Sequence, residues 1–354
     1  MGKRLKNSVG IWAFGPGSTR FLPDGYRSGL RNERMFEKVK RVVDGLEDWV
    51  DGFEFHYPNE INENNVDKIK NALGDKDIYA IPLGFHNMKE FINGSFVNPD
   101  DNLRSKAIYL AKRAVDLAAS ENSHLIIWPG GEGYNYPFEV NYSEIWNRFI
   151  EGIGEVVEYA GQKGVAVFLE HKNSEPARRV LMRDIGMTLF TINKIEKMGI
   201  DVTNLKINLD WQHLLMNNEP LAEYAALLGS EGLLGHLHAN DGWDKFDDDF
   251  ITGTNNFIQS LAIARELQRM DYGQNGERVG FDIFPLTVNP IEAVKRSIIH
   301  WEFIYDLAAR IDDKELVKAQ QNKDAIGAYE VVYEALGLDK SYIDKLYDER
   351  KKLS

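Results

Sequence analysis

The chain has 354 residues and an ordinary globular composition, 43% hydrophobic and 27% charged, which is enough sequence to bury a large core. It contains no cysteine, and this excludes a disulfide framework and a thiolate metal site, so any metal ion would need oxygen and imidazole ligands, which favours Mn²⁺, Mg²⁺ or Co²⁺. The formal net charge of −13 argues against a nucleic acid or an anionic membrane as partner.

The N-terminus begins with a basic segment, residues 1–8, and continues with a short apolar run, residues 9–14. The run ends at Gly15-Pro16-Gly17, so it is too short for the core of a secretory signal peptide. No stretch of the chain approaches the roughly 20 apolar residues that span a bilayer. We therefore expect a soluble, cytoplasmic protein without a membrane partner.

Strand-like and helix-like segments alternate along the whole chain. Short apolar or alternating runs predict strands at residues 9–14, 52–56, 78–85, 125–128, 165–169, 205–210, 233–237 and 278–281. Amphipathic stretches predict helices at residues 32–46, 64–73, 101–119, 143–160, 184–198, 221–228, 254–270 and 291–311. Eight strand-helix units in strict alternation predict an α/β fold, a single (β/α)₈ TIM barrel over residues 1–312.

Four successive predicted strands lead into side chains that can bind a metal ion: Glu170, Asp210, His238 and Asp282. The active site of a (β/α)₈ barrel is built at the C-terminal ends of its strands, so we expect these side chains to form one divalent metal site. His213 follows Asp210 by three residues and emerges at the same strand end. His236 faces the same way as His238, and we expect His238, nearer the strand's end, to be the ligand.

An acidic segment follows His238, with five aspartates among residues 241–249. Carboxylates this close to a metal site repel one another unless a cation neutralises some of them. We therefore expect a second ion, held by His213 and Asp244 together with Asp247 or Asp248. A solvated acidic loop is the alternative.

The chain continues beyond the eighth predicted barrel helix as a charged helical tail, residues 313–354. Its apolar stripe consists of Ile326, Tyr329, Val332, Tyr333 and Leu336. A complete barrel needs no further helix, so we expect the tail to form a contact within a homodimer or homotetramer.

The chain resembles the xylose isomerase family and, more broadly, the sugar isomerase barrels that include L-rhamnose isomerase. In the first half, Phe53-Glu54-Phe55-His56 is similar to the family's Phe-His after strand two, and Trp128-Pro-Gly-Gly-Glu-Gly-Tyr134 to Trp-Gly-Gly-Arg-Glu-Gly-Tyr. Further on, the similar segments are Glu170-His-Lys172-Asn-Ser-Glu175-Pro176, Asp210-Trp-Gln-His213, His238-Ala-Asn240, Gly242-Trp243-Asp244 and Gly280-Phe281-Asp282. The chain differs from xylose isomerase at Asn59, where the family has the aspartate partner of its histidine, and at Gly131.

The resemblance implies an aldose–ketose isomerase that uses divalent metal ions and a hydride shift on a pentose or hexose. By position, Glu170, Asp210, His238 and Asp282 would hold the first ion, and the second would share Asp210 and take His213 and Asp244. Lys172 would bind the substrate's O1 and His56 would assist ring opening. Trp12, Trp128 and Glu132 would line the sugar site together with His213.

Two other enzyme classes use the same barrel. Keto-sugar epimerases and related dehydratases or lyases act through a pair of carboxylates as acid and base, and Glu132 and Glu175 are the candidates here. Lys172 and the Asp210–His213 pair favour isomerisation instead. A barrel endonuclease needs a basic groove, which the net charge of −13 disfavours.

Overall fold

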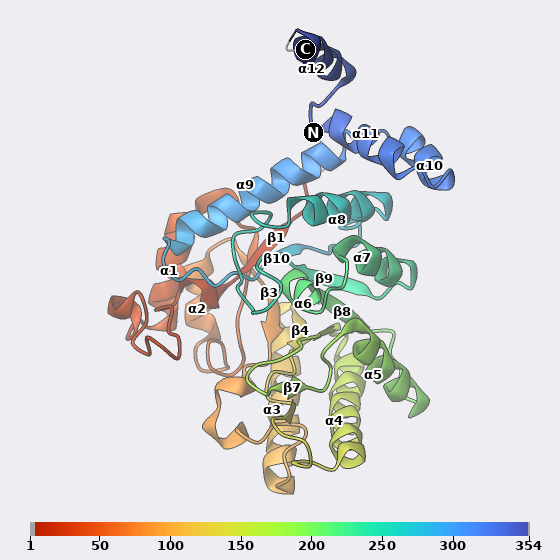
Figure 1. Cartoon of the computed structure of the whole chain (residues 1–354). Helices are drawn as coiled ribbons and strands as arrows, with labels where there is room; N and C mark the ends of the chain where they lie inside the picture. The colour runs from red at the N-terminus through yellow and green to blue at the C-terminus, as the bar shows by residue number, and fades with distance from the viewer. Residues whose placement is uncertain (1–3, 353–354) are drawn as a thin grey trace.

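The structure, a computed structural model, describes residues 4–352 and contains a closed barrel of parallel strands with helices around it (Figure 1). The strands follow the order β1-β10-β9-β8-β6-β4-β3-β2, and pairing of β2 with β1 closes the ring. Their bounds are Asn7–Gly10 (β1), Gly52–Glu54 (β2), Asp77–Pro82 (β3), His124–Ile127 (β4), Val167–Glu170 (β6), Leu205–Asp210 (β8), Leu234–His238 (β9) and Val279–Phe281 (β10). The predicted barrel is confirmed.

The predicted barrel helices are all present, and one short helix directly after β8 was not predicted. Their bounds are Met35–Leu46 (α1), Val66–Leu73 (α2), Asp101–Glu121 (α3), Tyr142–Lys163 (α4), Ile185–Lys197 (α5), Trp211–Met216 (α6), Leu221–Ser230 (α7), Phe257–Arg269 (α8) and Pro290–Ala308 (α9). Local sequence explains their limits: in α3, the Asp100 side chain accepts hydrogen bonds from the first turn, and Asn122 ends the helix in a left-handed conformation. One apolar cluster fills the space between strands and helices.

The first predicted strand, residues 9–14, is wrong after its first two residues. β1 ends at Gly10, and Ile11–Phe14 forms a short 3-10 helix. Ile11 and Phe14 are nevertheless fully buried, so the apolar run continues through a packed turn rather than through a strand. A Cβ atom added to Gly10 would lie 2.1 Å from Trp12 Cε2, so this glycine lets the indole fold back over the strand end.

Strand register brings the ends of neighbouring strands to one level. Asp210 of β8 lies opposite His238 of β9, and His238 lies opposite Gly280 of β10. Glu170 of β6 lies opposite Asn208 of β8. Two short antiparallel strands, Gly133–Tyr134 (β5) and Arg179–Val180 (β7), tie together the segments that follow β4 and β6. The C-terminal mouth of the barrel is therefore a continuous rim of polar strand ends.

The tail forms three helices, Asp313–Gln321 (α10), Ala325–Ala335 (α11) and Lys340–Lys351 (α12), at one end of the molecule in Figure 1. α10 packs on the barrel, because Leu316 and Ala319 are buried and Asp313 pairs with two arginines of α8, at 2.6 Å and 2.8 Å. Neither α11 nor α12 contains a buried residue. Within residues 4–352, no helix combines the length and apolarity that crossing a membrane requires.

The predicted apolar stripe of the tail is divided between two sides of α11. Val332 and Leu336 are partly buried against the barrel core, whereas Ile326 and Tyr329 are exposed by 75% and 53%. Tyr329 and Tyr333 stack on each other at a ring distance of 5.8 Å. The exposed side of α11 is therefore available to another subunit, as are the exposed apolar side chains of α12, which are Tyr342, Ile343, Leu346 and Tyr347.

We expect removal of residues 323–354 to convert a homo-oligomer into a monomer, because that segment carries the exposed apolar side of α11. Sedimentation velocity of the full chain and of the truncated chain measures the change. Phe303→Glu on α9 is the matched control, since Phe303 is an exposed aromatic residue on the barrel itself and its replacement should leave the assembly intact. A full-length protein that sediments as a monomer would contradict the prediction.

Candidate metal centre

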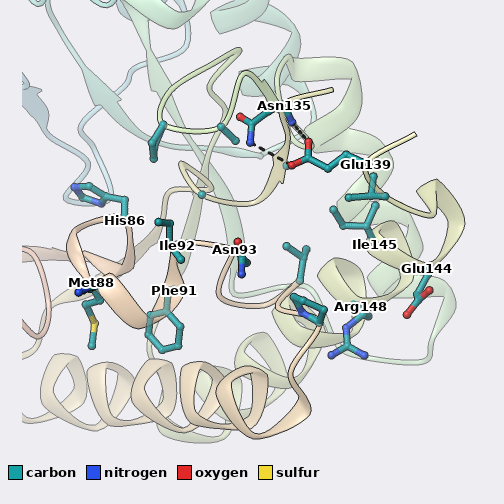
Figure 2. A pocket seen from close by; sticks show the side chains of 18 of the residues that line it. His86, Met88, Phe91, Ile92, Asn93, Asn135, Glu139, Glu144, Ile145 and Arg148 are labelled. Atoms are coloured by element: carbon teal, nitrogen blue, oxygen red, sulfur yellow. Dashed lines mark hydrogen bonds between the residues drawn. The ribbon is translucent and has the colours of Figure 1, made fainter. Parts of the chain in front are cut away.

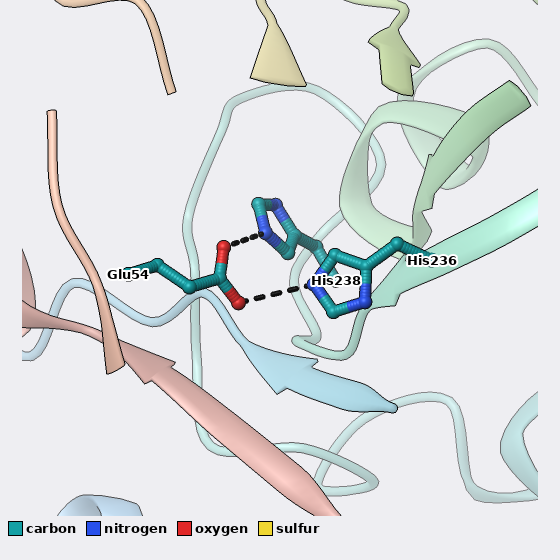
Figure 3. A group of neighbouring side chains, drawn as sticks. All are labelled: Glu54, His236 and His238. Carbon is teal, nitrogen blue, oxygen red and sulfur yellow. Dashed lines mark hydrogen bonds and ion pairs between the residues drawn. The ribbon is translucent and has the colours of Figure 1, made fainter. Parts of the chain in front are cut away.

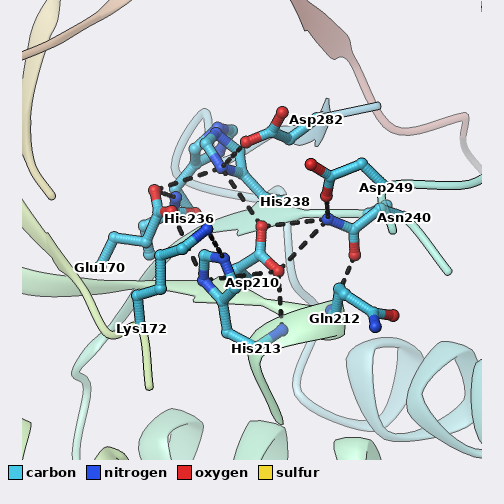
Figure 4. A network of polar contacts seen from close by, with 12 residues as sticks. Glu170, Lys172, Asp210, Gln212, His213, His236, His238, Asn240, Asp249 and Asp282 are labelled. Carbon is cyan, nitrogen blue, oxygen red and sulfur yellow. Dashed lines mark hydrogen bonds and ion pairs between the residues drawn. The ribbon is translucent and has the colours of Figure 1, made fainter. Parts of the chain in front are cut away.

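Four strand ends bring the predicted ligands of the first ion together (Figure 4). Glu170, Asp210 and His238 are the last residues of β6, β8 and β9, and Asp282 directly follows β10. One ligand atom from each residue lies within 4.8 Å of all the others. Divalent ions bind carboxylate oxygen and imidazole nitrogen at about 2.0–2.6 Å, so the gap between these atoms has the size that one ion needs.

The orientation of His238 fits a cation as well. Its Nδ1 atom lies 3.3 Å from Glu170 Oε2, 3.3 Å from Asp282 Oδ2 and 3.7 Å from Asp210 Oδ2. This nitrogen is buried and makes no hydrogen bond within the described residues. The opposite nitrogen, Nε2, lies 3.0 Å from a carboxylate oxygen of Glu54. A buried nitrogen that faces three carboxylates is a donor set for a positive ion.

The electrostatics of the cluster are also those of a cation site. Burial lowers the pKa of His238, but the charges of Glu54 and Glu170 outweigh burial and raise this pKa well above its ordinary value. Burial raises the pKa of Asp210 to about 7, helped by Glu170 and Asp282 against the opposing charge of His213. Without a cation, protons therefore offset the negative charge, and a divalent ion would displace them.

A second group of charged side chains lies beside the cluster. α6 begins directly after β8, and the backbone N–H of His213 donates to Asp210 Oδ1 at 3.0 Å, which turns the ring toward the site. His213 Nδ1 lies 3.6 Å from oxygens of Glu170 and Asp210, and His213 Nε2 lies 3.2 Å from Asp247 Oδ1. The ammonium of Lys172 pairs with the other oxygen of Asp247. Lys172, predicted to bind substrate, thus has Asp247 as its partner.

The acidic loop contributes Asp247, one of the predicted ligands, together with Asp249, which was not predicted, instead of Asp244. Asp244 is exposed and, among the described residues, makes no hydrogen bond or ion pair with the cluster. Asp248 accepts a hydrogen bond from the backbone of Trp243 at 2.8 Å. Asp247 and Asp249 point inward instead, so the expectation that Asp244 completes the second group does not match this geometry.

Neighbouring amides explain which aspartates enter the site. Gln212 Nε2 donates to the carbonyl oxygen of Phe246 at 2.5 Å and holds that part of the loop over α6. Asn240 Nδ2 lies 3.1 Å from Asp210 Oδ2 and 3.0 Å from Asp249 Oδ1, so one amide joins the two carboxylates. Burial raises the pKa of Asp249 well above its ordinary value, and the charge of Asp247 adds to the rise. Sequence reasoning missed Asp249, although the run of three aspartates at 247–249 was the signal.

The predicted aromatic wall lies next to the cluster. Trp12 Nε1 donates to Asp282 Oδ1 at 2.6 Å, and the Trp12 ring lies 4.4 Å from that of His56. His56 Nδ1 lies 3.0 Å from Glu60 Oε2. The carboxylate partner that the sequence lacks at Asn59 is therefore supplied one residue later.

The wall continues from His56 to Lys172 through a residue that sequence reasoning missed. His86 lies 5.5 Å from His56 and 4.5 Å from Trp128, measured between ring centres. Lys172 Nζ lies 5.3 Å from the centre of the Trp128 ring. Burial lowers the pKa of His86 to about 3, so this imidazole is neutral at pH 7. No local motif marks His86, because it lies in the turn after β3.

A cavity of about 750 Å³ borders the wall on the Trp128 side, between the segments that follow β3 and β4 (Figure 2). Its lining runs from His86 and Met88 past Asn93 to Ile145 and Arg148. The four cluster residues are not part of this lining. The cavity is therefore a neighbour of the metal centre rather than the centre itself.

The two carboxylates considered as an acid and base pair for the alternative epimerase chemistry, Glu132 and Glu175, lie elsewhere. Glu132 is buried beneath a loop, where it accepts hydrogen bonds from the backbone of Ser95, Phe96 and Val97 at 2.9, 3.1 and 3.0 Å. Burial outweighs these hydrogen bonds and raises the pKa of Glu132. Glu175 is exposed. The predicted substrate contact of Glu132 is not supported, because its oxygens hold the loop.

The fold and the cluster define a (β/α)₈ barrel whose strand ends form a site suited to a divalent cation. Residues 43–302 match the family model described as Xylose isomerase-like TIM barrel. The chain belongs to this family.

Proteins similar to the chain in sequence include sugar isomerases, and solved structures that share its fold include sugar epimerases. The xylose isomerase of Thermus thermophilus is 24% identical over 225 residues, which cover 61% of this chain and 56% of that protein. A probable sugar isomerase of Mesorhizobium japonicum is 23% identical over 357 residues, covering 94% of this chain and 77% of that protein. The solved structure of L-ribulose 3-epimerase has a TM-score of 0.65 at 17% identity and covers 89% of this chain and 98% of its own. Such similarity establishes the shared barrel.

Proposed function

We propose that this protein is a divalent-metal-dependent isomerase that interconverts an aldose and a ketose of five or six carbons by hydride transfer between C1 and C2. The observation that carries the proposal is the buried ammonium of Lys172 beside the carboxylate and histidine cluster. Lys172 Nζ lies 3.5 Å from His213 Nε2 and pairs with Asp247. A fixed positive charge at that point suits the negative charge that develops on substrate O1 during hydride transfer.

The cluster would hold two ions. Glu170, Asp210, His238 and Asp282 would bind the first, and Asp210, His213, Asp247 and Asp249 would bind the second. Bound ions of this kind act as Lewis acids on substrate oxygens. The chain contributes the fixed geometry: Asn208 Nδ2 donates to Glu170 Oε2 at 2.8 Å, and Asn240 joins Asp210 to Asp249. The oxygen-rich donor set favours Mn²⁺, Mg²⁺ or Co²⁺.

Lys172 would act as a charged hydrogen-bond donor throughout the reaction. Burial lowers its pKa, but the carboxylates of Asp247 and Asp249 outweigh burial and raise the pKa above the ordinary lysine value. The side chain therefore stays protonated at neutral pH and donates to O1 without giving up its proton. Trp128, whose ring lies 5.3 Å from the ammonium, shields this contact from water.

Sugars enter mainly as closed rings, so a proton must reach the ring oxygen before isomerisation. His56 stands at the Trp12 side of the site and is held by Glu60, whose pKa is kept below its ordinary value by His56 although burial raises it. An imidazole with a carboxylate partner can deliver such a proton. We assign this ring-opening role to His56 and orientation of its ring to Glu60.

Epimerisation is the second candidate, because solved structures that match this chain include sugar epimerases. An epimerase exchanges a carbon-bound hydrogen through two carboxylates on either side of the substrate. Glu132 and Glu175 do not lie in the cluster, so the carboxylates left for that chemistry are those of the cluster itself, Glu170, Asp210 and Asp282. Nothing in that mechanism uses the Lys172 ammonium, and we rank it second for this reason.

The fate of the hydrogen on C2 distinguishes the two reactions. We expect aldoses with deuterium at C2, incubated with the protein and Mn²⁺, Mg²⁺ or Co²⁺, to give ketoses that keep the deuterium at C1, since a hydride shift moves the atom without exchange. Mass spectrometry and proton NMR of the product measure the label, over a panel of pentoses and hexoses. The control reaction runs unlabelled sugar in deuterium oxide and should leave carbon unlabelled. Full solvent deuterium at carbon would refute the hydride shift and favour proton transfer.

A further inference from the structure

A buried carboxylate outside the cluster links two histidines of one strand (Figure 3). Glu54 is the last residue of β2, and its side chain is fully buried inside the barrel. Glu54 Oε1 lies 3.0 Å from His236 Nε2, and Glu54 Oε2 lies 3.0 Å from His238 Nε2. The hydroxyl of Ser8 donates to Oε1 at 2.7 Å. Glu54 therefore joins strands β1, β2 and β9 by side-chain contacts.

The neighbouring strand leaves room for this bridge. Gly280 of β10 lies opposite both Ser8 and His238 in the strand register. A Cβ atom at this position would lie 2.7 Å from Glu54 Oε1 and 2.7 Å from His236 Nε2, which is closer than unbonded heavy atoms of this kind pack. A glycine is thus needed at residue 280 for Glu54 to reach both histidines.

Hydrogen-bond chemistry then dictates which nitrogen of His238 is available. An ionised carboxylate accepts hydrogen bonds and donates none, so each Nε2 that faces Glu54 carries the hydrogen. In its neutral form, His238 then has its lone pair on Nδ1. That atom lies 3.3 Å from both Glu170 Oε2 and Asp282 Oδ2, on the side of the cluster. The contact with Glu54 therefore presents a ligand atom to the place where the carboxylates converge.

We propose that Glu54 is a positioning residue for the metal centre, which fixes the tautomer and ring orientation of His238. The inference rests on the proposed metal site. Mutation of the carboxylate partner of a metal-binding histidine typically weakens metal binding by about 10–100-fold. Glu54 lies 184 residues before His238 in the chain, so sequence spacing gives no indication of this role.

A separate ion between Glu54, His236 and His238 fits the contacts less well, although ligand atoms of the three also lie within 4.8 Å of one another. Both Nε2 atoms already lie at hydrogen-bond distance from separate Glu54 oxygens. If one ion were bound there and another in the cluster, His238 would have to bind the first ion through Nε2 and the second through Nδ1. A hydrogen-bonded bridge satisfies all three side chains without that demand.

Glu54→Gln tests the inference because it keeps the shape of the side chain but replaces one hydrogen-bond acceptor with a donor. The new amide group donates a hydrogen bond where the carboxylate accepted one, and so favours a hydrogen on Nδ1 of the histidine that it faces. We titrate metal-free protein with Co²⁺ and follow both the heat of binding and the visible absorption of the bound ion. The expected result is about 10–100-fold weaker Co²⁺ binding and an altered spectrum. Circular dichroism of the metal-free variant checks that the barrel is folded.

His236→Gln is the matched comparison, since it changes the same buried layer but keeps a donor toward Glu54 and leaves the Glu54–His238 contact in place. We expect it to bind Co²⁺ with nearly wild-type affinity and spectrum. Wild-type binding by Glu54→Gln, or an equal loss in His236→Gln, would overturn the positioning role. If Glu54→Gln does not fold, Glu54→Asp takes its place in the same titration. This variant shortens the side chain by one methylene and so moves the carboxylate away from His238, and the same results would support or overturn the proposal. Failure of the wild-type protein to bind Co²⁺ would instead reject the metal site itself.

Discussion

Lys172→Met is expected to lower kcat by about 10²–10³ while the protein still binds its first divalent ion, because loss of one charged contact to the transition state in a site closed to water costs about 3–4 kcal/mol. Methionine keeps the length and much of the volume of the side chain, so Trp128 retains its neighbour. Among the described residues, the hydrogen bonds and ion pairs of the ammonium are with His213 and Asp247, which are not ligands of that first ion. Steady-state kinetics on the best substrate, with calorimetry of metal binding, measures the two effects separately.

Lys206→Met is the matched control for that experiment. Lys206 lies near the start of β8, at the other mouth of the barrel, where its ammonium donates to the carbonyl oxygen of Gly232 at 2.5 Å. Its replacement removes the same charge from the same barrel without touching the site, so kcat should stay near the wild-type value. Undiminished turnover in Lys172→Met would contradict the assigned contact to O1 and would favour epimerisation.

Asp282→Asn and His238→Ala are expected to weaken binding of the first divalent ion by more than about 100-fold, since even changes beyond the direct ligands cost about 10–100-fold. Asp282→Asn should not disturb the local packing, because an amide has nearly the same shape as a carboxylate. The amide also keeps an oxygen that can accept the hydrogen bond that Trp12 Nε1 donates to Asp282 Oδ1. His238→Ala removes the nitrogen that faces the three carboxylates. Elemental analysis and calorimetry with Mn²⁺ measure the loss.

Asp77→Asn controls for the removal of one carboxylate from the barrel. Asp77 begins β3 at the opposite mouth and pairs with Arg278, which directly precedes β10. Its replacement should lower stability without changing metal affinity. If Asp282→Asn and His238→Ala bind Mn²⁺ as tightly as the wild type, the ion lies elsewhere and the proposed assignment of ligands is wrong.

The barrel and its strand ends were predictable because their signals are local. Alternating and continuous apolar runs occur within a few residues, and they predicted the strands that end at Glu170, Asp210 and His238. A closed parallel barrel then brings all strand C-termini to one mouth, whatever the loops do. The convergence of these residues with Asp282 follows from topology alone, and the structure contains it.

Partners that depend on the conformation of a loop were not predictable in the same way. His56 was expected to lack a carboxylate partner because the position three residues on is Asn59, yet Glu60 reaches it through the backbone turn after β2. Glu132 lies in a motif that indicated substrate binding, but the loop at residues 95–97 uses its oxygens. Both outcomes depend on how a loop folds back, which spacing along the chain does not encode.

The amino-acid sequence by itself determined the fold, the strand ends that carry the first set of candidate ligands, and the absence of thiolate ligands, because each follows from composition or short-range periodicity. Only the tertiary structure decided that Asp247 rather than Asp248 enters the site together with Asp249, that Asp244 stays outside it, and that Glu54 holds His238. Several aspartates within one short loop are equivalent in sequence. Contacts from Gln212 and Asn240, on other segments, select among them, because a loop adopts the conformation in which its buried polar groups are hydrogen-bonded.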